Sequence, residues 1–303
     1  MRILVLGSSG YLGGHIAERL RALPGVRLLT GGRRPADDLP VDLATVEPGV
    51  LAGVLERAAP DAVVNCAGAV GGGALTLTEV NSRGPAVLCE AMNHAVPTAR
   101  LVHLGSAAEY GPTALGARTG EDAPARPVAL YGASKLAGTL AVTGSGLDAV
   151  VLRVTNPVGP GAPRAGLPGR LTAELSAALT RPRQDASVQV GDLSAHRDFV
   201  DVRDVAQAAA LALTASRPLP PVLNIGSGRA VRVRELVHGL VRASGFRGRV
   251  EESLGAVGRS AAVPWQCAEV ALATSELGWQ PQHALVASLD ALWAADGSVG
   301  ERR

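Results

Sequence analysis

The chain has 303 residues and a formal net charge of +2, and 47% of its residues are hydrophobic, which is enough for one large core or for a cofactor domain with a smaller partner. The small net charge argues against a general affinity for nucleic acid or membranes, and no apolar run reaches the ~18 residues of a membrane-spanning helix. Three widely spaced cysteines fit neither a disulfide framework nor a metal site, so we expect a cytoplasmic protein.

The first half of the chain alternates short apolar runs with longer helical segments. Strands are predicted at Ile3–Leu6, Val26–Thr30, Ala62–Cys66, Leu101–Leu104 and Ala149–Val154. Helices are predicted at Gly13–Ala22 and at about 43–58, 76–95 and 131–143. Continuous apolar strands with helices between them are typical of an α/β fold, here a Rossmann-type doubly wound parallel sheet covered on both faces.

The pattern changes beyond Pro157, where Gly and Pro become frequent. The later predictions are a helix at about 169–180, a strand at Ser187–Val190, a helix at Asp201–Ala215, a strand at Val222–Ile225 and a helix at Val233–Ala243. We therefore expect a dinucleotide-binding domain at 1–156, to which 195–228 returns. Residues 157–194 and 229–296 would form a smaller C-terminal substrate-binding lobe.

A glycine-rich segment follows the first predicted strand and precedes the first helix. It reads Gly7-Ser8-Ser9-Gly10-Tyr11-Leu12-Gly13. A tight turn there would bring backbone N–H groups of the loop against a pyrophosphate at a helix N-terminus. Glycine pairs are common in turns, but this position in a βαβ unit favours dinucleotide binding over a purely structural turn. Gly7, Ser9, Gly10, Tyr11, Leu12 and Gly13 are the candidate cofactor contacts.

The end of the second strand bears on the choice of dinucleotide. An acidic residue there would bind the ribose 2′-hydroxyl of NAD, but this chain has Arg33 and Arg34. Two guanidinium groups suit a 2′-phosphate, so NADP(H) is favoured and NAD(H) is possible; a solvated basic loop is the alternative. Further cofactor contacts are expected at two strand ends, in Asp42-Leu43 and Cys66-Ala67-Gly68.

Tyr131 and Lys135 lie four residues apart, on one face of a predicted helix. A free tyrosine has a pKa of about 10, and a neighbouring cation is expected to lower it. Tyr131 would then exchange a proton with a carbonyl oxygen, while Lys135 binds the nicotinamide ribose. Lys135 is the only lysine in the chain, which argues against a chance surface pair. Ser106, after the fourth apolar strand, is the expected third donor to that oxygen.

These motifs are joined by others in the second half, namely Arg153–Gly161, His196–Val205, Asn224–Gly228 and Leu277–Pro281. Taken in order, they resemble the extended short-chain dehydrogenase/reductases, a family of nucleotide-sugar epimerases, dehydratases and ketoreductases. The likeness covers nearly the whole chain. Segments 105–111 and 190–199 are most similar to the NDP-4-keto-6-deoxyhexose reductases, particularly the GDP-4-keto-6-deoxymannose reductase type.

The resemblance implies that Asn156, Arg197 and Arg259 face a sugar nucleotide, with the two arginines on its diphosphate. A salt bridge to Asp198 or Asp201 is the alternative for Arg197. Base stacking is expected to be weak or to come from Trp265. The resemblance also implies a homodimer formed through helices 76–95 and 131–143. No metal is expected, since the six histidines show no ligand spacing.

One departure from the family bears on the reaction. The dehydratases carry an acid and a base directly after the Ser or Thr, where this chain has Ala107 and Ala108, and Glu109 is expected to cap local structure. The resemblance thus favours an NADP(H)-dependent 4-ketoreductase of a nucleotide-linked 6-deoxyhexose. Alternatives are an NDP-sugar epimerase with tightly held NAD and a ketoreductase of a non-sugar intermediate. A catalytically silent NADP(H) sensor would have no use for Tyr131 with Lys135.

Overall fold

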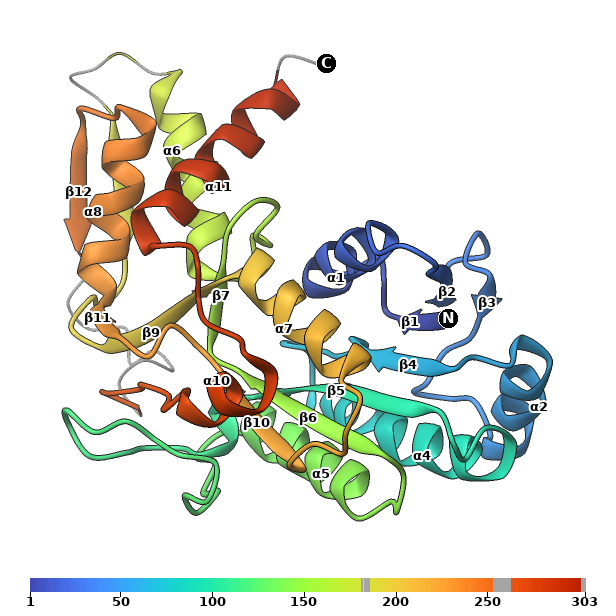
Figure 1. Ribbon diagram of the computed structural model, residues 1–303. Helices are drawn as coiled ribbons and strands as arrows, with labels where there is room; N and C mark the ends of the chain where they lie inside the picture. Colours follow the sequence, from blue (N-terminus) through green and yellow to red (C-terminus); the bar gives the residue numbers. More distant parts are fainter. Residues whose placement is uncertain (181, 183–185, 253–262, 301–303) are drawn as a thin grey trace.

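The structure is a computed structural model that describes residues 1–180, 182, 186–252 and 263–300 (Figure 1). Its largest element is a seven-stranded sheet with the order β10-β6-β5-β4-β1-β2-β3, in which every pair is parallel. The strands are β1 (Arg2–Leu6), β2 (Arg27–Gly32), β3 (Leu39–Pro40), β4 (Ala62–Asn65), β5 (Arg100–Ser106), β6 (Ala149–Val154) and β10 (Val222–Ile225). The predicted Rossmann-type sheet is confirmed.

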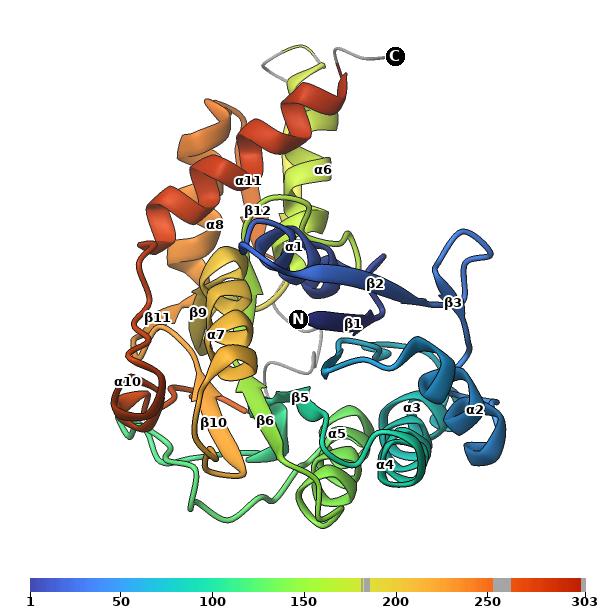
Figure 2. The ribbon, with the colours of Figure 1, turned by 45° about the vertical axis from the view of Figure 1, so that its right-hand side comes forward.

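Helices cover both faces of this sheet (Figure 2). One face carries α1 (Tyr11–Arg21) and α7 (Val202–Thr214), which pack on each other; the other carries α2 (Pro48–Ala58), α4 (Gly84–Ala95) and α5 (Leu130–Thr143). In β1, Ile3 and Val5 enter the core beneath α1, whereas Leu4 and Leu6 enter the core beneath α2 and α4. Because both faces of the strand are buried, its sequence is apolar without alternation.

The rest of the chain forms the smaller part seen at the upper left of Figure 1. It holds a three-stranded sheet of β7 (Asn156–Val158), β9 (His196–Asp201) and β11 (Ala230–Arg232), and a two-stranded sheet of β8 (Ser187–Val190) and β12 (Arg249–Glu252). Helices α6 (Leu167–Leu179), α8 (Val233–Ser244) and α11 (Leu285–Gly300) enclose a separate core. Helix α10 (Ala271–Leu277) packs against β10 and α7. The domain boundaries given above stay a prediction.

Two predicted helices differ in detail from the observed ones. The segment predicted at 76–95 consists of α3 (Ala74–Thr78), one π-helical turn η1 (Glu79–Arg83) and α4. The helix predicted at 43–58 begins only at Pro48. A proline disfavours helical conformation in the residue before it, and Glu47 is extended, so Pro48 marks the helix start.

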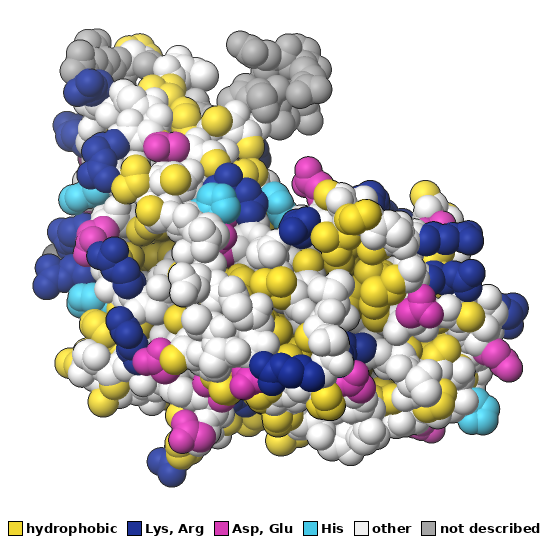
Figure 3. Space-filling model, in the orientation of Figure 1, with side chains coloured by type: hydrophobic (Ala, Val, Ile, Leu, Met, Phe, Trp, Pro, Cys, Tyr) yellow, Lys and Arg dark blue, Asp and Glu magenta, His cyan; other side chains and the backbone are white. Residues whose placement is uncertain are grey.

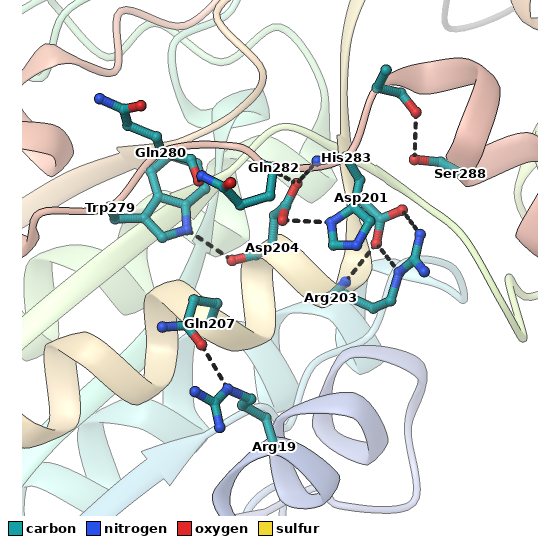
Figure 4. A network of polar contacts seen from close by, with 11 residues as sticks. Arg19, Asp201, Arg203, Asp204, Gln207, Trp279, Gln280, Gln282, His283 and Ser288 are labelled. Carbon is teal, nitrogen blue, oxygen red and sulfur yellow. Dashed lines mark hydrogen bonds and ion pairs between the residues drawn. The ribbon is translucent and has the colours of Figure 1, made fainter.

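A polar network fixes the N-terminus of α7 against the segment that leads into α11 (Figure 4). The buried Asp204 carboxylate accepts hydrogen bonds from the backbone N–H of Gln282 and of His283, and it pairs with His283 Nδ1 at 2.7 Å. The indole of Trp279 donates to the backbone oxygen of Asp204 at 2.9 Å. One carboxylate thus holds together segments that are almost eighty residues apart.

Charged side chains of both signs are spread over the surface shown in Figure 3, in keeping with the small net charge. Exposed arginines are frequent over α8 and β12, at the left edge of that view. Two of these, Arg234 and Arg249, pair with Glu252 and Glu251. Among the residues that the structure describes, no helix combines the length and the apolar character needed to span a bilayer.

Candidate active site

The glycine-rich loop between β1 and α1 is drawn tightly against neighbouring backbone. Gly7 has a φ of +77°, and a Cβ atom on it would lie 2.8 Å from the backbone nitrogen of Ala67. A Cβ on Gly13 would lie 2.2 Å from the carbonyl oxygen of Gly7. Real side chains do not tolerate such distances, so glycine is required at both positions. The carboxyl ends of β1 and β4 therefore meet at the N-terminus of α1.

Several features of this loop fit a dinucleotide pyrophosphate. Gly10 is the N-cap of α1 and has no side chain that could occupy the N–H groups of the first turn, and both Ser9 and Gly10 are exposed. Ser8 Oγ is buried and has no hydrogen-bond partner in the described part of the chain. A helix N-terminus with open donors attracts anions. The loop residues therefore suit a phosphate ligand.

Two of the predicted loop contacts also face other parts of the protein. The Tyr11 hydroxyl donates to the carbonyl oxygen of Gly159 at 3.3 Å, which connects α1 with the loop after β7. Leu12 packs against the core between α1 and the sheet. Burial, aided by the Asp201 carboxylate, raises the pKa of Tyr11.

The segment after β2 contains an acidic residue that sequence reasoning missed. Arg33 and Arg34 directly follow β2, and both are exposed. Asp37, from the following turn, is buried, and one of its carboxylate oxygens lies 2.9 Å from where a Cβ on Gly32 would stand. It also accepts from the Arg34 guanidinium at 3.1 Å. An acidic residue was expected directly after the strand. Here the turn after β2 brings the Asp37 carboxylate back beside Gly32, at the end of the strand.

The other predicted cofactor residues lie at the ends of β3 and β4. Asp42 accepts a hydrogen bond from the backbone N–H of Ala44, and Leu43 is buried. A Cβ on the exposed Gly68 would lie 3.9 Å from Lys135 Nζ, which brings the segment after β4 next to α5. Cys66 and Ala67 directly precede it. Burial raises the pKa of the Cys66 thiol to about 12, against an opposing effect of the Lys135 ammonium.

The only lysine of the sequence, Lys135, lies on α5, next to the carboxyl end of β5. Lys135 is 5% exposed, and its Nζ donates to the carbonyl oxygen of Leu104 at 2.5 Å. Burial lowers the pKa of Lys135 to about 8, while the negative charge of Glu109 opposes that change. A buried ammonium thus stands at the end of β5, one helical turn from Tyr131.

The pKa of Tyr131 departs from the sequence prediction. We expected Lys135 to lower it, but burial raises it, with an opposing hydrogen bond to Ser106 and a further upward effect of Glu109. Desolvation disfavours the phenolate, and the lysine is engaged with Leu104. The structure does bring Ser106 and Tyr131 together, and a protonated phenol results.

Ser106 ends β5 and caps the short 3₁₀ helix η2 (Ala107–Glu109). Its Oγ accepts from the N–H of Ala108 at 3.2 Å, and Glu109 accepts from the N–H of Ser106 at 2.7 Å. The predicted capping role of Glu109 is confirmed. Ala107 and Ala108 carry no group that transfers a proton.

Two of the predicted substrate residues, Asn156 and Arg197, lie on strands β7 and β9 of the smaller part. Asn156, which begins β7, donates to the carbonyl oxygen of Asp198 at 2.8 Å and to Gln266 Oε1 at 2.6 Å. The alternative partners considered for Arg197 are engaged elsewhere: Asp201 by Arg203, and Asp198 by Ser227, Gly228 and Ala268. Trp265 packs on His196, with ring centres 5.1 Å apart. Arg259 lies outside the described residues.

Residues 3–226 match the model of the NAD dependent epimerase/dehydratase family. The chain is 36% identical to the dTDP-6-deoxy-L-talose 4-dehydrogenase (NAD(P)(+)) of Kitasatospora kifunensis, over 98% of this chain and 96% of that protein. It is 30% identical to a UDP-glucose 4-epimerase of Azospirillum brasilense, over 93% of this chain and 88% of that protein.

Solved structures also resemble this one over their whole length. MoeE5 in complex with UDP-glucuronic acid and NAD superposes with a TM-score of 0.86 at 26% identity, covering 99% of this chain and 100% of that one. RMD from Pseudomonas aeruginosa, complexed with NADPH, gives a TM-score of 0.84 at 25% identity, covering 98% and 99%. The likeness therefore includes both the main sheet and the smaller part.

Proposed function

Because the chain belongs to the NAD dependent epimerase/dehydratase family, the extended short-chain dehydrogenase/reductases, we propose that it reduces the 4-keto group of a nucleotide-linked 6-deoxyhexose with NADP(H). In coarser terms, it is an NAD(P)-dependent enzyme that acts on nucleotide sugars. The observation that carries the proposal is the grouping of Tyr131 with the buried Ser106 and Lys135, at the carboxyl end of the sheet beside the glycine-rich loop.

Each of these side chains has a distinct role in the proposed reduction. A bound nicotinamide dinucleotide supplies the hydride. Tyr131 donates its phenolic proton to the substrate oxygen, and its raised pKa keeps that proton in place at neutral pH. Ser106 donates a hydrogen bond to the same oxygen, and the Lys135 ammonium binds the nicotinamide ribose. The reverse oxidation uses the same contacts in the opposite order.

The proposed preference for NADP(H) rests on the segment after β2. Arg33 and Arg34 are exposed there and suit a 2′-phosphate. The Asp37 carboxylate beside Gly32 suits the 2′-hydroxyl of NAD instead, so use of NAD(H) is also supported. The relative from Kitasatospora kifunensis carries both cofactors in its name.

The proposed substrate contacts are Asn156, Arg197 and Arg259. Asn156 is held by two hydrogen bonds, to Asp198 and Gln266, where the chain passes from β6 of the main sheet into the smaller part. Burial lowers the pKa of Arg197, which nonetheless stays cationic at neutral pH and suits a diphosphate. Ala107 and Ala108 supply neither acid nor base, which argues against a 4,6-dehydratase.

We also propose a homodimer formed through α4 and α5. Leu140 on α5 is 63% exposed and Leu130 at its start is 46% exposed, both on the side away from the sheet. Covering such leucines in a paired helical surface is favourable. Sedimentation or light scattering of the purified protein measures this directly.

The assay mixes purified protein with dTDP-, GDP- or UDP-linked 4-keto-6-deoxyhexoses and follows oxidation of NADPH or NADH. We expect stoichiometric oxidation with one of these substrates. Tyr131→Phe should lower turnover by roughly 10² to 10⁴-fold, the usual contribution of a proton-transfer group, with NADPH affinity unchanged. Full turnover of this variant would contradict the proposed chemistry.

The main alternative is an NDP-sugar epimerase, supported by the likeness to the enzyme of Azospirillum brasilense. An epimerase returns its hydride to the same sugar, so it retains NAD through purification and consumes no NADPH. Interconversion of two nucleotide sugars without added cofactor would favour this alternative.

A further inference from the structure

Glu109 is a fully buried carboxylate that connects three structural elements at the candidate active site. One oxygen accepts from the N–H of Ser106 at 2.7 Å, at the end of β5. The other accepts from Thr139 Oγ1 on α5 at 2.9 Å and from Arg153 Nε on β6 at 2.8 Å. Glu109 is 0% exposed, so bulk solvent does not reach the carboxylate.

These contacts fix the elements that carry the proposed catalytic side chains. Thr139 follows Lys135 by four residues and Tyr131 by eight, so all three lie on one face of α5. The bond from Glu109 to Thr139 therefore fixes this face of the helix relative to the end of β5. The bond to Ser106 fixes the residue that carries the second donor.

Glu109 has more polar partners than it needs to cap the three-residue helix η2. Arg153 pairs with it while buried, and the Arg153 guanidinium also lies 4.5 Å from the centre of the Tyr110 ring. The Tyr110 hydroxyl in turn donates to Asn224 at 2.7 Å. Burying the Glu109–Arg153 ion pair costs desolvation energy, so stability alone does not account for its presence. This favours a functional role for the pair.

We propose that Glu109 is a positioning residue of the reaction, which holds Ser106 in register with Tyr131 and Lys135. This inference rests on the proposed function. It assigns to Glu109 a role beyond capping η2.

Charge supports this role as well as geometry. Burial lowers the pKa of Lys135, whereas Glu109 and Cys66 raise it. Burial and the Lys135 charge lower the pKa of the nearby His103. Tyr131 faces Ser106 and Glu109. Removing the carboxylate charge should lower the pKa of Lys135 below about 8, so that the ammonium is lost at a lower pH than in the wild type.

The test is Glu109→Gln, which keeps the size of the side chain and removes its charge. We expect kcat to fall at least tenfold, KM and NADPH affinity to change less than threefold, and the high-pH limb of the kcat profile to move to lower pH. Glu121→Gln is the matched control. Glu121 is a partly buried carboxylate that accepts from the N–H of Asn224, and its substitution should leave kcat and the pH profile unchanged.

An unchanged kcat and pH profile in folded Glu109→Gln would overturn the inference, as would an equal effect of Glu121→Gln. If Glu109→Gln fails to fold, Thr139→Val removes a single bond to the carboxylate, and a kcat lowered at least threefold with unchanged NADPH affinity is expected; no loss would overturn the inference. Tyr131→Phe separates the two proposals. An active Tyr131→Phe refutes the proposed function, whereas an inactive Tyr131→Phe with a fully active Glu109→Gln refutes only the role of Glu109.

Discussion

At the scale of single residues, burial of Lys135 changes the charge on which its proposed catalytic role depends. Its ammonium is enclosed between the segment after β4 and the end of β5, where it donates to the carbonyl oxygen of Leu104. Burial lowers the pKa of Lys135 to about 8. The group therefore changes charge within the range in which enzymes are commonly assayed, which an exposed lysine does not do.

We expect turnover to fall as the pH rises through about 8, because deprotonation removes the charge that we propose binds the ribose. Lys135→Arg should keep its charge over this range and lose this limb of the profile, although its overall activity will be lower. The measurement is kcat against pH for both proteins. An identical limb in Lys135→Arg would assign it to another group.

The proposed cofactor choice also depends on single side chains, after β2. Arg33→Ala should weaken NADPH at least tenfold and leave NADH nearly unchanged, because only NADPH carries the 2′-phosphate. Asp37→Asn should act in the opposite direction, weakening NADH and favouring NADPH, since it removes a negative charge beside Gly32. Titration of each variant with both cofactors measures this. Equal effects on NADPH and NADH would contradict the assignment.

At the scale of elements, the loop between β1 and α1 depends on two close backbone approaches. Gly13→Ala should disturb the loop and abolish dinucleotide binding, because its Cβ would meet the oxygen of Gly7 at 2.2 Å. Gly14→Ala is the control, since its Cβ would make ordinary contact at 3.6 Å with the oxygen of Ser8. Alanine within a helix stabilises it by ~0.4–1 kcal/mol relative to glycine where the backbone allows. Calorimetric titration with NADPH distinguishes the two variants.

At the scale of the whole molecule, Asp204 joins α7 to the segment before α11. Asp204→Asn should lower the free energy of unfolding by about 1–3 kcal/mol, the range for a buried charged acceptor that loses its partners. The exposed Asp290→Asn should change it by less than about 0.5 kcal/mol. Urea denaturation of both variants provides the comparison. A similar stability for the two would show that the network contributes little.

The main sheet was predictable because burial on both faces makes its strands continuously apolar. Strand β6, for example, was predicted with both of its observed ends, Ala149 and Val154. Strand β9 was missed because it contains His196, Arg197 and Asp198, and polar residues in a row do not suggest a strand. The Asp198 carboxylate is buried there and accepts from Ser227 and Ala268, which are distant in sequence.

The same limit applies to the candidate site. The glycine-rich loop and the Tyr131–Lys135 pair are patterns of neighbouring residues, so both could be proposed from the sequence alone. The cap formed by Glu109 was also local and was predicted. Its bonds to Thr139 and Arg153, like the return of Asp37 to the end of β2, depend on tertiary structure, and no local pattern signals them.

The chain passes from the main sheet into the smaller part without a linker. Strand β6 ends at Val154 and β7 begins at Asn156, and on the return path β9 ends at Asp201 where α7 begins at Val202. Two further crossings are loops, at 226–229 between β10 and β11 and at 278–284 between α10 and α11. Strands β7 and β9 thus continue directly from elements that pack on or belong to the main sheet, and variants selected for an altered sugar or nucleobase should carry side-chain changes on these two strands.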